Sequence, residues 1–293
     1  MTTGDSSQAR ATRRGIICMV AAMTFFTIND AFFKLAAANV PVWQLIFLRS
    51  LLVSLITFAA ARSVASIDVM LGMFRGRVGL RALTEATAML LYLWSLTHIP
   101  IANAAAIILS SPLFLAGFAA LFLGERVTLG RWAAALLGFV GVLFIVQPHP
   151  GAFDVWSLVC LASTLLFATR DVLTRGIPAA IPSTVVALAT AVVGTLLALL
   201  MMLLTGTSAV GARDAGYIVA AAFFVAAGFY LITVSFRSAE VSVVGPFRYS
   251  SLLVAVALGY FIWGEVPNAL GWLGVALMLG AGALMLLLER RRS

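Results

Sequence analysis

The sequence predicts an all-α polytopic membrane protein, with ten transmembrane helices arranged as two inverted five-helix repeats. Three observations predict this class: the apolar composition, the length of the apolar runs and an internal duplication. Of the 293 residues, 62% are hydrophobic and only 10% are charged, and the mean hydropathy is +1.09. A soluble protein of this length could not bury so much apolar surface, so the composition indicates a membrane protein.

The apolar runs are each about 20 residues long, which is enough for a helix to cross a hydrocarbon core of about 30 Å. In chain order they cover residues 15–36, 42–62, 77–97, 101–123, 129–147, 153–176, 183–205, 213–236, 241–263 and 268–288. The links between them are short, so no room remains for a folded soluble domain. The first run carries polar residues and is long for a signal peptide, so we expect it to be a retained span.

Some of these runs contain residues that disturb or tighten a helix. Pro112 in the fourth run and Pro246 in the ninth each remove a backbone donor, which predicts a kink or a bend that lines a cavity. The fifth and tenth runs are rich in glycine, and small residues permit close contact between helices. That contact could lie within the molecule or between subunits, so the sequence allows a monomer or a homodimer.

Basic residues are distributed unevenly between the two predicted sides of the membrane. If the N-terminus is cytoplasmic, the cytoplasmic ends of the spans hold most of the arginines, and the other side holds only Lys34 and Arg213. This asymmetry follows the positive-inside rule, and an even number of spans places both termini in the cytoplasm. We therefore expect the net charge of +8 to face the anionic headgroups of the cell inner membrane rather than a nucleic acid.

An internal duplication organises the chain. Equivalent residues recur at offsets of 140 or 141: Asp30 and Asp171, Pro41 and Pro182, Trp132 and Trp272. The near-constant offset predicts two repeats, residues 1–148 and 149–293, with five spans each. Because five is an odd number, the second repeat enters the membrane from the opposite side. Inverted repeats of this kind can expose one site alternately to each side of the membrane.

A Gly-Glu turn followed by a glycine-rich span occurs twice, in IANAAAIILSSPLFLAGFAALFLGERVTLGRWAAALLGFVGVLFI (101–145) and in VSVVGPFRYSSLLVAVALGYFIWGEVPNALGWLGVALMLGAG (241–282). These segments resemble the ends of two EamA domains. Nearly the whole chain resembles the drug/metabolite transporter superfamily in its ten-span form, and its length and layout are similar to those of YddG-type amino-acid exporters. The resemblance implies an inner-membrane carrier whose cavity is lined mainly by spans 1–4 and 6–9.

Two charged pairs occupy equivalent places in the two repeats. Asp30 precedes Lys34 by four residues, and Asp171, which follows Arg170, precedes Arg175 by four, so each pair lies on one side of its helix. One interpretation is a pair of gates that close the two sides of the membrane alternately. Another is that each pair neutralises itself at the interface, where the basic side chain reaches water. The third interpretation is that these pairs contact a substrate directly.

Three charged residues lie deeper in their spans. Arg49, Glu85 and Arg248 are about seven residues from a span end, or about 10 Å deep at 1.5 Å per residue. A charge at that depth costs at least about 2.5 kcal/mol, so it should face a wet cavity or a partner. Either an arginine pairs with Glu85, or an arginine binds a substrate carboxylate through its planar guanidinium. None has a charged counterpart in the other repeat, which favours a role in substrate binding.

Aromatic and polar residues accompany these charges. The residues expected to line the same cavity are Phe25, Asn29, Tyr92, Trp94, Tyr230, Pro246 and Tyr249. Any one of these aromatic residues could instead face lipid or the membrane interface. Together they predict a cavity with apolar walls and a few polar anchors, which suits a small amphipathic organic molecule.

The sequence therefore predicts a secondary transporter that exports small organic metabolites, above all amino acids and among them aromatic ones, by alternating access. It carries no enzyme motif, and neither a metal site nor a cofactor is expected, because the only histidines, His98 and His149, lie at a span end or in a loop. The alternatives are a multidrug, organic-cation or nucleotide-type carrier of the same superfamily, or a channel-like facilitator. The expected partners are a small-molecule substrate and the lipid bilayer.

Overall fold

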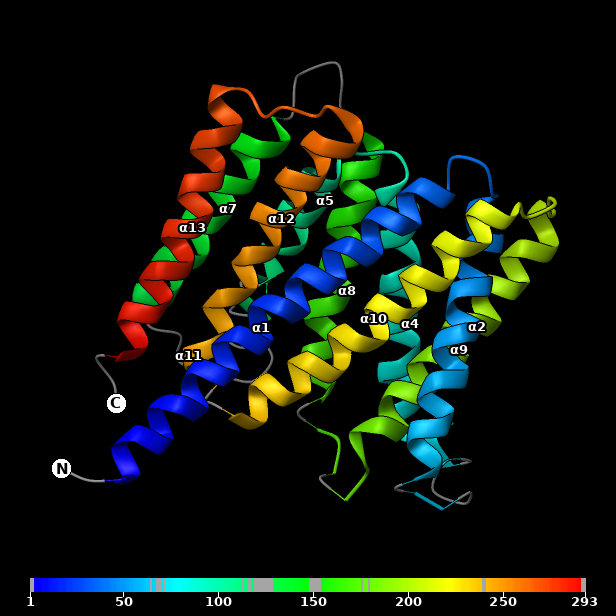
Figure 1. Ribbon diagram of the computed structural model, residues 1–293, viewed down its shortest axis with the longest axis horizontal. Helices are drawn as coiled ribbons and strands as arrows, with labels where there is room; N and C mark the ends of the chain where they lie inside the picture. The colour runs from blue at the N-terminus through cyan, green and yellow to red at the C-terminus, as the bar shows by residue number, and fades with distance from the viewer. Residues whose placement is uncertain are drawn as a thin grey trace.

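The computed structural model is a bundle of helices (Figure 1). It describes residues 3–63, 65–66, 70, 72–111, 113–114, 117–118, 129–147, 154–174, 176–178, 180–238 and 241–290. No strand occurs among these residues. Both chain termini lie on the lower side of the molecule in Figure 1, which we call the terminal face, and the opposite side is called the distal face.

The first half of the chain forms α1 (Thr3–Ala36), α2 (Val42–Arg62), η1 (Gly72–Phe74), α4 (Gly76–Leu96), α5 (Ile101–Ile108) and α7 (Leu129–Val146). Two of these helices, α2 and α5, begin directly after a proline, Pro41 or Pro100, whose backbone is extended with ψ of 133° or 143°. Proline fits such a position because the first donors of a helix have no partner within it. The sequence thus sets where both helices start.

The second half forms α8 (Val155–Thr174), α9 (Ser183–Thr205), α10 (Ala212–Ser238), α11 (Val241–Val244), η2 (Gly245–Tyr249), α12 (Ser250–Leu258), η3 (Gly259–Trp263) and α13 (Ala269–Arg290). The segment predicted as a ninth span, 241–263, is divided into two α-helical pieces, a 3₁₀ piece (η2) and a π-helical piece (η3). Pro246 lacks the N–H that a continuous helix would need at that point.

Five of the described helices are long and apolar enough to cross a membrane: Arg10–Ala36, Val42–Arg62, Val155–Thr174, Ser183–Thr205 and Ala212–Ser235. Shorter apolar helices follow at Trp132–Val146, Phe247–Trp263 and Ala269–Leu284. A helical segment coincides with each of the ten predicted spans, and the predicted all-α polytopic class is confirmed. The first helix is longer than predicted, since it starts at Thr3 instead of residue 15.

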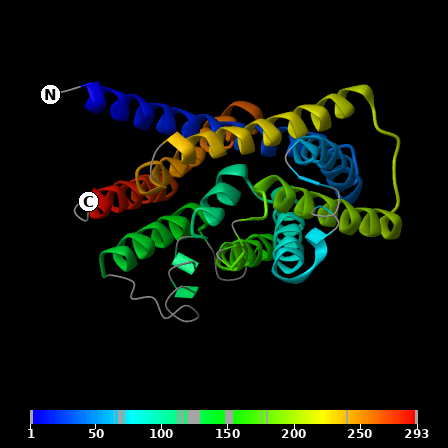
Figure 2. The ribbon, with the colours of Figure 1, turned by 90° about the horizontal axis from the view of Figure 1, so that it is seen from below.

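Packing between the helices follows the duplication. The most extensive contacts join α1 to α10, α4 to α8, α2 to α9 and α7 to α13. The counterpart of α1 in the second repeat is α8, and α10 is the counterpart of α4. Exchanging the repeats therefore converts the α1–α10 contact into the α4–α8 contact. The α2–α9 and α7–α13 contacts each join two counterparts and stay the same. Figure 2 shows α7 and α13 together at one end of the molecule and α2 and α9 at the other. This pattern is the one expected of two repeats related by a two-fold axis.

One hydrogen bond marks the position of that axis. Ser54 Oγ and Thr195 Oγ1 lie 3.0 Å apart, and the two residues are separated by 141 positions in the chain. The repeat offset in this part of the sequence is also 141, so each of these residues contacts its own counterpart. A residue can touch its counterpart only where the axis passes, which places the axis between α2 and α9.

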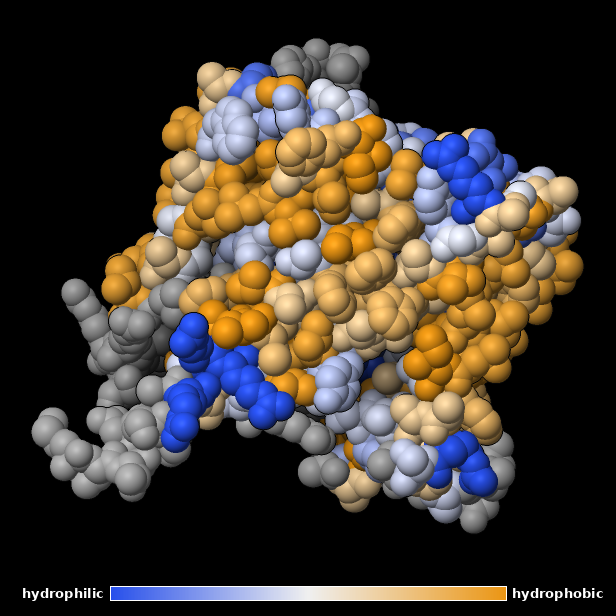
Figure 3. All heavy atoms as spheres, in the orientation of Figure 1, coloured by the Kyte–Doolittle hydropathy of each residue, from blue (hydrophilic) through white to orange (hydrophobic). Residues whose placement is uncertain are grey.

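The outer surface of the bundle is apolar over its middle. Large side chains such as Leu200, Phe223 and Leu55 are 55%, 62% and 58% exposed. In Figure 3, hydrophobic residues cover the middle of the visible face, and the most hydrophilic ones gather toward its ends. An exposed apolar band between polar ends is the surface of a helical membrane protein.

Candidate substrate-binding site

A buried arginine on α2 connects that helix to α1 through its side chain. Arg49 on α2 is only 4% exposed, and its Nε donates a hydrogen bond of 2.9 Å to Asn29 Oδ1 on α1. Its Nη1 lies 4.0 Å from Met89 Sδ on α4, and thioether sulfur is a weak acceptor. No carboxylate forms a direct ion pair with Arg49 in the part of the chain that the structure describes.

Asn29 connects this arginine to a carboxylate. Its Nδ2 donates to Asp30 Oδ1 at 2.8 Å, and Asp30 Oδ2 accepts a hydrogen bond of 2.6 Å from the Tyr92 hydroxyl on α4. The four residues Arg49, Asn29, Asp30 and Tyr92 therefore form one chain of hydrogen bonds across α2, α1 and α4, which we call the central cluster. Asn29 bridges the Asp30 carboxylate and the Arg49 guanidinium, which do not form a direct ion pair.

The central cluster retains capacity for a ligand. A guanidinium has five N–H donors, and two of those of Arg49 are used, one by Asn29 and one by the weak acceptor Met89 Sδ. An ionised carboxylate has about four acceptor positions, and two of those of Asp30 are used. A group with a carboxylate and an ammonium could therefore bind to both residues without breaking the hydrogen bonds already present.

A second charged cluster lies nearer the terminal face. Glu85 on α4 pairs with Arg81 one turn earlier at 2.6 Å and with Arg170 on α8 at 2.5 Å, and it accepts a hydrogen bond of 2.9 Å from Thr190 on α9. Arg170 also pairs with the adjacent Asp171 at 2.8 Å. These five residues, called the terminal-side cluster, tie α4 of the first repeat to α8 and α9 of the second.

A third ionic contact lies toward the distal face. Lys34 Nζ, near the end of α1, donates to the Ile99 carbonyl oxygen at 2.8 Å and lies 3.4 Å from Glu265 Oε1. It also sits 4.9 Å from the centre of the Trp263 ring. This set, called the distal contact, links α1 to the α4–α5 connection and to the segment after η3.

The predicted pairings of the charged residues are corrected by these distances. Within the described residues Lys34 pairs with Glu265 and not with Asp30, which binds Asn29 and Tyr92 instead. Glu85 pairs with neither Arg49 nor Arg248, since Arg81 and Arg170 occupy it. Spacing along one helix identified the charged residues, but the partner of Lys34 and one partner of Glu85 come from segments distant in sequence.

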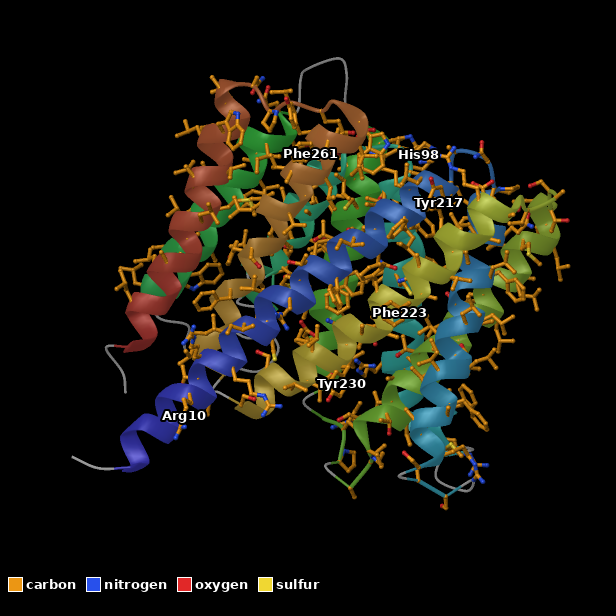
Figure 4. All side chains as sticks on the ribbon, viewed as in Figure 1. Arg10, His98, Tyr217, Phe223, Tyr230 and Phe261 are labelled. Carbon is orange, nitrogen blue, oxygen red and sulfur yellow. The ribbon has the colours of Figure 1, made fainter. Side chains whose placement is uncertain are left out.

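Other predicted cavity residues are placed differently. Phe25 packs edge-on against Phe224 of α10 with ring centres 5.1 Å apart, whereas Tyr230 is 69% exposed and lies outside the three clusters (Figure 4). Tyr249 is buried at the contact with α13, where its ring touches the position of Gly282. Figure 4 places Tyr230 toward the terminal face and Phe261 toward the distal face.

Trp94 belongs to an aromatic cluster at the distal end of the bundle. Its ring centre lies 5.3 Å from that of Trp43 and 5.0 Å from that of Trp156, and His98 stacks on Trp156 at 3.5 Å. Tryptophan is enriched where a bilayer meets water, because its ring is apolar and its N–H is polar. Trp94 contacts Trp43 and Trp156 and is not one of the residues of the central cluster.

Arg248 lies in η2 with an exposed side chain, and it interacts electrostatically with Arg170 and Asp171 of the terminal-side cluster. The side chain of Pro246 and all of Arg175 lie outside the described residues, as does the predicted repeat boundary at 148/149. No group of three or more His, Cys, Asp or Glu residues that could hold a metal ion occurs in the described part.

Three site residues were not predicted as such from the sequence. They are Arg81, Thr190 and Glu265. The one signal that could have found Glu265 is its place in the repeated Gly-Glu turn. Its sequence separation of 231 residues from Lys34 carries no local pattern.

Comparisons with known proteins agree with this architecture. The model of the EamA-like transporter family matches residues 13–147 and 154–287. A pseudopaline exporter of Pseudomonas aeruginosa is 28% identical and covers 92% of this chain and 94% of its own length. A riboflavin transporter of Rhizobium johnstonii is 32% identical, covering 67% of this chain and 65% of its own, and an S-adenosylmethionine uptake transporter of Rickettsia bellii is 24% identical over 72% of each.

A solved structure described only as a crystal structure of a protein has the same fold. It superposes with a TM-score of 0.69 at 20% sequence identity, covering 95% of this chain and 98% of that one. None of the three relatives named above is an amino-acid exporter, so the predicted likeness to that subgroup is not supported by them. Their names give three different small organic substrates.

Proposed function

Since this chain belongs to the EamA-like transporter family, we propose that it exports small organic metabolites that carry a carboxylate, above all amino acids, across the inner membrane by alternating access. The observation that carries this proposal is Arg49. It is buried, it is held by Asn29, and no carboxylate of the described residues pairs with it directly. A buried cation without an ionic partner is costly, and a substrate carboxylate would supply that partner.

Asp30 extends the proposed substrate to amino acids. It lies one residue from Asn29, so its carboxylate is next to the guanidinium that Asn29 holds. An amino acid would place its carboxylate on Arg49 and its ammonium on Asp30, and each buried charge would gain a partner of opposite sign. Tyr92, whose hydroxyl binds Asp30, would contact an aromatic side chain of the substrate.

The clusters on either side of the central cluster would act as gates. The distal contact joins α1 to the second repeat through Glu265, and the terminal-side cluster joins α4 to the second repeat through Arg170. Each must separate for α1 or α4 to move away from the opposite repeat. Breaking one while the other holds would open the central cluster to one side only, as alternating access requires.

Orientation and direction follow from charge and from the relatives. The start of α1, the end of α2 and the start of α4 lie toward the terminal face (Figure 1), which we assign to the cytoplasm by the positive-inside rule, because these helix ends and the residues beside them carry Arg10, Arg13, Arg14, Arg62, Arg75 and Arg77. Export is favoured over uptake because the pseudopaline exporter aligns over nearly the whole of both chains. The riboflavin and S-adenosylmethionine transporters align over a smaller part.

Counterflow in liposomes tests this function. The purified chain is reconstituted with unlabelled L-phenylalanine inside, and entry of labelled L-phenylalanine is measured with increasing concentrations of competitor. We expect saturable counterflow that 3-phenylpropionate and phenethylamine, which lack the ammonium or the carboxylate, inhibit at least tenfold less well than L-phenylalanine. Flux that does not saturate would indicate a channel. Equal inhibition by phenethylamine would exclude carboxylate recognition, and inhibition only by nucleotides or bulky organic cations would favour those substrates.

A further inference from the structure

A cleft opens on the distal face beside the distal contact. It has a volume of about 380 Å³ and lies between α5, α7, the segment around η3 and α13. Asn103, Gln147, Glu265 and Asn268 supply its polar lining, and valines at 146, 256, 266 and 275 supply apolar walls. It is separate from the central cluster, because none of Arg49, Asn29, Asp30 and Tyr92 lines it.

Glu265 is the charged group of this cleft, and its carboxylate is poorly satisfied. Oε1 meets Lys34 at 3.4 Å, which is long for a charge-assisted hydrogen bond of about 2.7–2.9 Å. Oε2 is buried and accepts no hydrogen bond from the described residues. Lys34 meanwhile makes its shorter contact, 2.8 Å, with the Ile99 carbonyl. The carboxylate could therefore take a better donor without depriving Lys34 of all its partners.

The other polar groups of the cleft suit the same kind of ligand. Gln147 and Asn268 bond reciprocally through their amides, with Asn268 Nδ2 donating to Gln147 Oε1 at 2.8 Å and Gln147 Nε2 donating to Asn268 Oδ1. Asn268 Oδ1 also accepts from the Gly271 amide. Gln147 Nε2 also donates to the Phe144 carbonyl at 3.0 Å, so both of its N–H groups are engaged, and the charged group that the cleft offers beside its apolar walls is a carboxylate.

We infer that this cleft is a second binding site, for a molecule that carries an ammonium group on an apolar body, with Glu265 as its counter-ion. Its ligand would reach Glu265 from the distal side and compete with Lys34 for Oε1. Occupancy would weaken the distal contact and so favour opening toward that side. This effect on transport rests on the gating function proposed above, whereas binding itself does not.

Calorimetric titration of the purified full chain in lipid nanodiscs tests the inference, with benzylammonium chloride as the probe and benzyl alcohol as its uncharged control. We expect saturable binding of benzylammonium and at least tenfold weaker binding of benzyl alcohol. Glu265→Gln, which preserves the size of the side chain, should weaken benzylammonium binding at least tenfold. Lys34→Met should strengthen it, because the competing ammonium is gone.

Two further variants distinguish this cleft from the central cluster. Val266 is 66% exposed at the cleft, so Val266→Trp should obstruct the cleft and weaken binding while leaving Glu265 intact. An Asp30→Asn background removes the carboxylate of the central cluster, so any benzylammonium binding that remains in it cannot come from that cluster. Absence of saturable binding in that background, or survival of the remaining binding in Glu265→Gln, would overturn the inference. The titration needs no gradient and no transport, so a failure of the proposed export function would not alter its outcome.

Discussion

Replacing Arg49 by glutamine removes the charge on which the proposed substrate binding depends. Glutamine can still donate a hydrogen bond to Asn29 Oδ1, but it cannot pair with a carboxylate through two parallel N–H groups. A hydrogen bond to a charged group contributes about 1.5–3 kcal/mol, and each 1.4 kcal/mol is a factor of ten in an equilibrium constant. We therefore expect the apparent affinity for substrate to fall by roughly ten- to a hundredfold.

Arg49→Lys should lie between the parent and Arg49→Gln, since lysine keeps the charge and loses the planar fork. The assay is the concentration of substrate that gives half-maximal counterflow in liposomes, at matched amounts of protein. Gln44→Met provides the control on the same helix. Gln44 is also buried, and its amide binds the backbone of Ser208, so its loss should lower stability without changing affinity.

The reasoning fails if Arg49→Gln keeps the half-saturation value of the parent while folding normally by size-exclusion chromatography. A loss of folded protein would instead show that Arg49 serves the structure, because its positive charge offsets the nearby Asp30 carboxylate, and a buried charge left without an opposite charge is costly. In that case Arg49→Met combined with Asp30→Asn, which removes both charges, should restore the yield. If the double variant also transports with unchanged affinity, the central cluster does not bind the substrate.

Two other predictions concern the gates and the topology. Lys34→Met should make a cysteine placed at Asn103 more reactive toward an impermeant maleimide, whereas Glu85→Gln should leave that reactivity unchanged or lower it, because the two contacts close opposite sides. A partly exposed ion pair is worth about 1 kcal/mol, so we expect about a fivefold change in the population of the open state; equal effects of both variants would argue against gating. In a Cys18→Ser/Cys160→Ser background, a cysteine at Ser208 on the distal face should be labelled in intact cells and one at Ser63 should not, and the reverse result would invert the proposed orientation.

The positions of the helices were largely predictable, because bilayer thickness and proline placement act locally along the chain. The runs 42–62 and 183–205 coincide with α2 and α9, each of which starts directly after a proline. The duplication was also visible in sequence. A kink at Pro246 was expected, and the helix type changes there; the π-helical bonding of η3 within the same apolar run could not be predicted from periodicity.

The candidate site was predictable as a set of residues and not as a set of contacts. Asn29, Asp30, Arg49, Glu85 and Tyr92 were identified because charge and hydrogen-bonding groups are costly in an apolar span. Their long-range partners could not be predicted, because Lys34 contacts Glu265 and Glu85 contacts Arg170, and in each pair the two residues are far apart in the sequence. Tyr230 was misplaced because its neighbours in sequence could not show that this side of α10 faces outward.

The bond between Ser54 and Thr195 has a consequence for how such a molecule can move. If each repeat adopts in turn the conformation of the other, every off-axis pair of equivalent residues exchanges surroundings. Two equivalent residues that touch each other on the axis keep the same surroundings after the exchange, because each hydroxyl still faces the other. Under the proposed alternating access, the helices on either side would therefore rock about this bond, which would stay unchanged through the transport cycle and would favour neither direction of transport.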